Sequence, residues 1–217
     1  MAVKLLGICC SPRKGQTTFK AMRVCLAAAE EVSDQVETCI LELAGRDIKP
    51  CVACGTCKEG LTCSIKDDFC DLIPMIVDDT VKGIIIGTPV YLCCMTAQCK
   101  AFIDRSAMLR RNGWLLRNRV GGVFAVGGVR NGGQELTVQA VRAAMLCHDM
   151  ICISDGKPTA HLGGTVYSGG EGGIEADLPG LETVRNLGRR VAEVALMLPA
   201  KSSEELPGRK QHILQRG

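Results

Sequence analysis

Short apolar segments and amphipathic segments alternate along most of the chain, and this alternation limits the folds that the chain can adopt. The apolar segments, rich in β-branched residues, are expected to form strands at residues 3–9, 36–41, 82–87, 122–126 and 150–153. The amphipathic segments are expected to form helices at 18–32, 96–109, 133–146 and 181–197, with another near 68–77. Strands separated by helices in this way predict an α/β fold. We expect a five-stranded parallel sheet with helices on both faces.

Two long segments interrupt this pattern. Residues 43–70 form a cysteine-rich connection, and residues 154–180 form a glycine-rich one. Loops of this length inside a compact domain usually have a function. We therefore expect one domain over residues 1–198 that contains the insertion 43–70, followed by a C-terminal tail at 199–217.

Composition and charge exclude several classes of protein. The net charge is +3 and aromatic residues make up 3% of the chain, which does not suit a nucleic-acid surface built on basic stripes and base stacking. The chain has no apolar stretch of the ~20 residues that a membrane span needs. Its fourteen cysteines come without a signal-peptide pattern, which predicts a reducing, cytoplasmic location.

A polar loop between the first strand and the first helix has the composition of a phosphate site. Hydroxyl groups and free backbone N–H groups at a helix N-terminus suit a phosphate dianion. Neither a GxGxxG sequence nor a Walker loop is present, so FMN phosphate is the better prediction. The alternative is a plain polar turn in which Thr17 caps the helix. The candidate phosphate ligands are Ser11, Arg13, Gln16, Thr17 and Thr18.

Three separated motifs together resemble the NADPH-dependent FMN reductase-like flavoproteins of the flavodoxin-like superfamily. They are the loop just described, the segment Thr88-Pro89-Val90-Tyr91 with the later K-x-F-x-D-R stretch 100–105, and the loop 127–135. The loop between the first strand and the first helix lacks the Asn that the family usually carries near position 17. The resemblance implies a flavodoxin-like fold, bound FMN and a homodimer or homotetramer. It implies flavin contacts from Pro89, Val90, Tyr91, Leu92, Gly128, Arg130, Gly132 and Gly133.

Four cysteines lie close together in the first long connection. Cys51, Cys54 and Cys57 are spaced by three, and Cys63 follows after five intervening residues. This spacing favours a [4Fe–4S] cluster over zinc, whose motifs pair two C-x2-C units across a longer gap, and an empty or oxidised cysteine set is the other alternative. The run, followed by the acidic pair 67–68, also resembles the iron–sulfur flavoprotein branch of the family, which combines a [4Fe–4S] cluster with FMN.

The predicted function is that of an FMN-dependent oxidoreductase that passes electrons between the cluster, FMN and a small acceptor. Ferredoxin or NAD(P)H is the expected electron donor, and neither a nucleic acid nor a membrane is an expected partner. One alternative is an NAD(P)H-dependent FMN or quinone reductase without a cluster, and another is a non-catalytic electron carrier or redox sensor. Neither His148 nor His161 forms a plausible triad, so no catalytic side chain is predicted.

Overall fold

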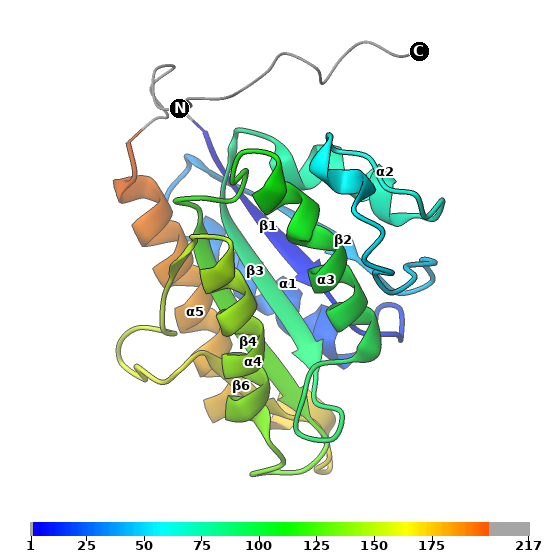
Figure 1. The fold of residues 1–217 in the computed structure, drawn as a ribbon. Coiled ribbons are helices and arrows are strands. Elements are labelled where there is room, and N and C mark those ends of the chain that lie inside the picture. The colour runs from blue at the N-terminus through cyan, green and yellow to red at the C-terminus, as the bar shows by residue number, and fades with distance from the viewer. Residues whose placement is uncertain (1, 200–217) are drawn as a thin grey trace.

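A computed structural model describes residues 2–199, in which a single parallel sheet forms the centre of the molecule (Figure 1). The strand order is β2-β1-β3-β4-β5, and a further strand, β6, also pairs with β4. Most of the predicted tail lies outside the described residues. The flavodoxin-like sheet predicted from the sequence is confirmed. The strands are β1 (Val3–Cys9), β2 (Val36–Glu42), β3 (Val81–Pro89), β4 (Val120–Gly127), β5 (Ile151–Cys152) and β6 (Gly164–Tyr167).

Helices cover both faces of the sheet, and each face has its own core. On one face, α1 and α5 pack with Leu5, Ile85 and Phe124 of the sheet. On the other face, α2, α3 and α4 pack with Ile8, Ile86 and other strand residues. The central strands are buried on both sides, as expected for a parallel sheet with helical crossovers. The helices are α1 (Thr17–Glu30), α2 (Phe69–Val77), α3 (Ala97–Arg111), α4 (Gln134–Cys147) and α5 (Leu178–Met197).

The fifth strand position is shared by two short strands. β5 pairs with the first residues of β4, and β6 pairs with its last residues, from Phe124 to Gly127. Between them the chain leaves the sheet at residues 153–163. The sequence therefore predicted the strand at 150–153 but missed β6, together with a 3-10 helix at Gly173–Ala176, inside the glycine-rich segment.

The cysteine-rich connection runs from the end of β2 to the start of α2 and lies beside α3. Its one regular element in the described chain is a short 3-10 helix at Thr56–Lys58. No helix within residues 2–199 combines the length and apolar character needed to cross a bilayer.

Candidate functional site

The loop after β1 leads directly into the N-terminus of α1. Gln16 occupies the N-cap position with an extended backbone, and its side chain makes no capping hydrogen bond. The alternative interpretation, in which Thr17 caps the helix, is wrong, since Thr17 is the first residue of the helix. The first N–H groups of α1 therefore have no side-chain cap and remain suited to an anion.

Thr18 carries the strongest sign of an absent ligand in this loop. Its side chain is fully buried, and its Oγ1 has no hydrogen-bond partner in the described chain. A buried hydroxyl without a partner is costly, and such groups are rare in native proteins. A phosphate at the α1 N-terminus would give this hydroxyl an acceptor, so the residues present fit the phosphate of FMN.

Other predicted phosphate ligands hold the loop in shape. The backbone N–H of Arg13 donates to Ser11 Oγ at 3.1 Å, and its guanidinium donates to Thr17 Oγ1 at 3.4 Å. At the loop tip, the N–H of Gly15 donates to the carboxylate of Glu42, at the end of β2, at 2.7 Å. This last contact ties the loop to the neighbouring strand, and Glu42 was not among the predicted site residues.

The loop after β3 presents exposed side chains at the same edge of the sheet. Tyr91 and Cys94 exchange two backbone hydrogen bonds of 2.8 and 3.0 Å, which close a tight turn. Within this turn, Leu92 and Cys93 have positive φ angles of 48° and 61°. Leu92 is 101% exposed and Tyr91 is 50% exposed. An exposed apolar tip next to an aromatic ring suits contact with a flat ligand.

The loop after β4 packs directly on this turn. Gly133 caps α4 with φ of 98°, and a Cβ placed there would lie 2.7 Å from Cys93 Cα. Cys93 Sγ also donates to the carbonyl of Gly132 at 3.7 Å. Glycine is therefore required at position 133 both by the backbone angle and by the close approach of the two loops.

Hydrogen bonds connect the three loops. Cys10 N donates to Gly87 O at 2.8 Å, and Thr96 Oγ1 donates to Cys10 O at 2.8 Å. Val90 N donates to Val126 O at 2.9 Å. The structure thus brings loops 10–18, 89–94 and 128–133 together at the carboxyl ends of β1, β3 and β4, in the lower part of Figure 1. Parallel α/β sheets bind their ligands at this edge.

A polar cavity of about 70 Å³ extends this edge toward β6 and includes residues that the sequence reasoning missed. Arg130 was predicted, and its guanidinium lies 5.0 Å from the ring centre of Tyr167 and 3.3 Å from a carboxylate oxygen of Asp177. Tyr167 and Asp177 were not predicted, because both lie in the glycine-rich segment in which β6 was missed. The Gly169-Gly170 pair, which begins two residues after Tyr167, was the available signal.

Of the four cysteines of the insertion, Cys51 and Cys54 are exposed and Cys57 and Cys63 are partly buried. None of the four forms a disulfide. Within residues 2–199, no three Cys, His, Asp or Glu side chains form a group arranged to hold a metal ion. Hydrogen bonds with Ser64 and Thr56 lower the pKa of Cys54 to about 7, and Arg111 Nη1 donates to Cys57 Sγ at 3.0 Å. Four cysteine thiols in one loop are the right donor set for an iron–sulfur cluster, so the residue chemistry fits, although their sulfur atoms do not converge in the described structure.

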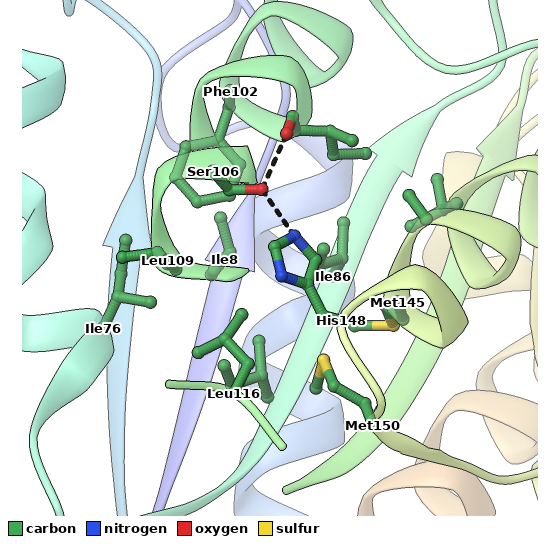
Figure 2. A pocket seen from close by; sticks show the side chains of 14 residues that line it. Ile8, Ile76, Ile86, Phe102, Ser106, Leu109, Leu116, Met145, His148 and Met150 are labelled. Atoms are coloured by element: carbon green, nitrogen blue, oxygen red, sulfur yellow. Dashed lines mark hydrogen bonds between the residues drawn. The ribbon is translucent and has the colours of Figure 1, made fainter. Parts of the chain in front are cut away.

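His148 lies away from this edge, beneath α3 and α4, beside an apolar cavity of about 30 Å³ (Figure 2). Ser106 Oγ donates to Ile103 O at 2.6 Å and lies 2.9 Å from His148 Nε2, so Nε2 is the donor between them. The other ring nitrogen, Nδ1, is buried without a hydrogen-bond partner in the described chain. Burial, together with the charge of Arg110, lowers the pKa of His148. A neutral, buried imidazole in an apolar cavity indicates a packing role.

Comparisons with known proteins agree with this geometry. Residues 3–165 match the family of NADPH-dependent FMN reductases. An iron–sulfur flavoprotein of Methanocaldococcus jannaschii is 44% identical over 197 residues, which cover 90% of this chain and 99% of the relative. An iron–sulfur flavoprotein of Methanosarcina thermophila is 36% identical over 192 residues, which cover 88% and 95% of the two chains.

Solved structures show the same fold. A flavodoxin-type WrbA-like protein from Agrobacterium tumefaciens superimposes with a TM-score of 0.64 at 20% identity, covering 92% of this chain and all of that one. The chain therefore belongs to the NADPH-dependent FMN reductase family, in its iron–sulfur flavoprotein branch, and it is a flavin-dependent oxidoreductase.

Proposed function

We propose that the protein binds FMN at the carboxyl edge of its sheet and a [4Fe–4S] cluster on its cysteine loop, and passes electrons between them and a small acceptor. The observation that carries the flavin assignment is the uncapped N-terminus of α1 beside the buried, unpartnered hydroxyl of Thr18. The relatives named iron–sulfur flavoproteins, which align over about nine tenths of the chain, support the cluster.

Each loop has a proposed part in holding FMN. Thr17, Thr18 and the N–H groups at the start of α1 bind the phosphate, and the loop containing Ser11, Arg13 and Gln16 surrounds it. The turn from Pro89 to Leu92 and the loop from Gly128 to Gly133 contact the ring, with Arg130 placed at the polar cavity. Bound FMN supplies the ability to exchange one or two electrons with other redox groups.

Cys51, Cys54, Cys57 and Cys63 are the proposed cluster ligands. A cluster supplies single-electron exchange, and its potential depends on hydrogen bonds to the sulfur atoms. Arg111, which donates to Cys57 Sγ at 3.0 Å, is placed to provide such a bond. The chain's own part in the reaction is to set the position of the cysteine loop relative to the flavin loops and the polarity around each group.

Partners and location are also proposals. Ferredoxin or NAD(P)H is the proposed donor, and a small molecule is the proposed acceptor. Two solved neighbours, a flavodiiron protein and a rubredoxin oxygen:oxidoreductase, match this chain over about a third of their own length, so they inform only the fold. A cytoplasmic location and a homodimer or homotetramer complete the proposal. No disulfide joins any of the fourteen cysteines, all of which lie within residues 2–199, and this agrees with a reducing compartment.

The rival function is an NAD(P)H-dependent FMN reductase that holds no cluster. The description of the matched family, which names NADPH as reductant, favours it. Anaerobic purification with iron, sulfide and FMN measured per chain separates the two functions. We expect one FMN and four iron atoms per chain, and stoichiometric FMN without iron supports the rival.

Serine variants make this test specific. Cys54→Ser should lose iron and keep FMN, whereas Cys147→Ser, which changes an exposed cysteine at the end of α4, should keep both. Folded wild-type protein that stays free of flavin in excess FMN contradicts the whole assignment. Equal iron contents in both variants contradict the assignment of the cluster to the loop.

A further inference from the structure

A buried ion pair joins α3 to the end of the cysteine-rich connection. Arg105 Nη1 donates to Asp67 Oδ2 at 2.8 Å, and Nη2 donates to Asp67 Oδ1 at 3.0 Å. The exposed fractions of the two side chains are 1% and 0%. The two groups thus form a bidentate, charge-assisted contact that water does not reach, which is the strongest kind of ion-pair geometry.

The same guanidinium also holds the beginning of the cysteine segment. Arg105 Nη1 donates to the carbonyl of Lys49 at 2.9 Å, and Lys49 N donates to Asp67 Oδ2 at 2.9 Å. Lys49 precedes the first of the four cysteines, and Asp67 follows the last. A backbone hydrogen bond of 3.0 Å from Asp68 N to Asp47 O runs beside this pair. Residues 50–66 therefore form a loop whose two ends are held together by Arg105 and by direct hydrogen bonds between residues 47–49 and 67–68.

Arginine is required at this point for geometric reasons. The guanidinium carbon lies 4.6 Å from the ring centre of Phe69, which in turn packs edge-on against Phe102 at 5.8 Å. A planar fork can bind two carboxylate oxygens while it lies on an aromatic ring, and a lysine ammonium cannot. Burial by itself would raise the pKa of Asp67. Hydrogen bonds from Arg105 and from the N–H groups of Lys49 and Phe69 outweigh it, and the pKa is lowered.

The other end of α3 holds the middle of the loop. Asn112 Nδ2 donates to the carbonyls of Cys57 and Gly60 at 2.9 and 3.2 Å. At its N-terminus, α3 is capped by Thr96, whose hydroxyl accepts from Cys99 N at 3.1 Å and donates to Cys10 O. One helix therefore contacts both the phosphate loop and the cysteine loop.

We propose that Arg105 is a positioning residue that, through Asp67 and Lys49, holds the two ends of the cysteine loop together at a set position along α3 before the cluster binds. This inference rests on the proposed cluster function. The ion pair needs no metal to form, so the closed ends precede cluster assembly and reduce the conformational entropy that the loop loses when it binds iron.

The test compares Arg105→Gln, Arg105→Lys and Asp67→Asn with Lys100→Gln as the matched control. Lys100 is on the same helix and pairs with Asp104, but on the solvent-exposed side, where an ion pair contributes little. The first readout is trypsin cleavage after the exposed Lys58 in metal-free protein. The second is the rate at which a chelator removes iron from the anaerobically isolated protein.

We expect both rates to rise about tenfold or more in Arg105→Gln and Asp67→Asn, because losing even one of the charge-assisted hydrogen bonds has about this effect. Arg105→Lys should lie between these variants and the wild type, and Lys100→Gln should match the wild type. FMN content should stay the same in all of them. Combining the Arg105 and Asp67 substitutions should add little to either single effect, because both break the same contact.

Two results overturn the inference. One is unchanged trypsin cleavage and iron loss in Arg105→Gln. The other is a parallel loss of FMN and iron in Arg105→Gln, together with a fall in thermal stability that accounts for both losses. That result would mean that Arg105 stabilises the fold as a whole and does not specifically position the cysteine loop. If the wild type holds no iron, the proposed cluster function fails, and the trypsin readout on its own still decides whether Arg105 closes the loop.

Discussion

Gly133 offers the sharpest test of how the flavin loops are assembled. It stands at the start of α4 with φ of 98°, and a Cβ there would lie 2.7 Å from Cys93 Cα, where ordinary contacts begin at 3.4 Å. In Gly133→Ala, the two loops must separate by about 1 Å or one backbone must twist. The left-handed backbone costs alanine about 1–2 kcal/mol, and the overlap adds about 1–3 kcal/mol.

Gly113 provides a matched control. Its φ is 97°, so Gly113→Ala carries a similar backbone cost, but a Cβ there meets nothing within 4 Å. It follows α3 at the opposite edge of the sheet from the flavin loops. The difference in free energy of unfolding in urea between the two variants therefore gives the energetic cost of the overlap alone. We expect Gly113→Ala to be the more stable variant by about 1–3 kcal/mol.

FMN affinity decides whether the contact matters for function. Displacing Cys93 moves the neighbouring backbone N–H groups of the turn that contains Tyr91 and Leu92. We expect the dissociation constant for FMN, measured by quenching of flavin fluorescence, to rise about tenfold or more in Gly133→Ala. It should not change in Gly113→Ala. Equal FMN affinities in the two variants would show that the contact between the loops after β3 and β4 does not shape the flavin site.

Three further predictions concern the phosphate site, the helix packing and the buried histidine. Thr18→Val removes an unpartnered buried hydroxyl, so the melting temperature of flavin-free protein should stay the same or rise. Calorimetric titration should show that this variant binds FMN about tenfold more weakly and binds riboflavin as the wild type does. Gly188→Ala would place a Cβ onto the carbonyl oxygen of Cys25, where α1 and α5 pack together. The free energy of unfolding, measured in urea, should fall by about 3 kcal/mol or more, and an unchanged urea midpoint contradicts this prediction. The pKa of His148 is lowered in the folded protein, so the unfolded chain binds a proton at this histidine more readily than the folded chain does. The free energy of unfolding should therefore fall as the pH drops below about 6.5, by at most ~1.4 kcal/mol per pH unit. His148→Gln should flatten this dependence in urea titrations at pH 7.5, 6.5 and 5.5, and an unaltered slope assigns it to other groups.

The sheet could be predicted because its strands are continuous apolar segments. The first strand was predicted at residues 3–9, and β1 has these bounds, because a strand buried on both faces needs an unbroken apolar run. Helix ends were predicted to within three residues, although α1 starts one residue earlier than expected. β6 was missed because its four residues include a glycine, and because its pairing with β4 is set by contacts distant in the sequence.

The convergence of the three proposed flavin loops was predictable to the extent that topology determines it. The three flavin loops follow strands that are neighbours in the sheet, so any parallel arrangement brings them to one edge. Side-chain contacts across the chain could not be predicted in this way. Arg105 and Asp67 both belonged to motifs recognised in the sequence, yet nothing in a local pattern indicates that residues 38 positions apart form one buried pair.

This difference predicts how the two cofactor regions respond to substitution. The flavin edge is held mainly by backbone hydrogen bonds and by glycines that allow close approach, such as Gly133 against Cys93. Most side-chain substitutions there should change ligand contacts while the edge keeps its shape. The cysteine loop has little regular structure, and its ends are held by one guanidinium group and a few hydrogen bonds between residues 47–49 and 67–68. A single substitution at Arg105 should therefore loosen the ends of this loop while the sheet and the proposed flavin edge stay folded, because the contacts that hold them are separate.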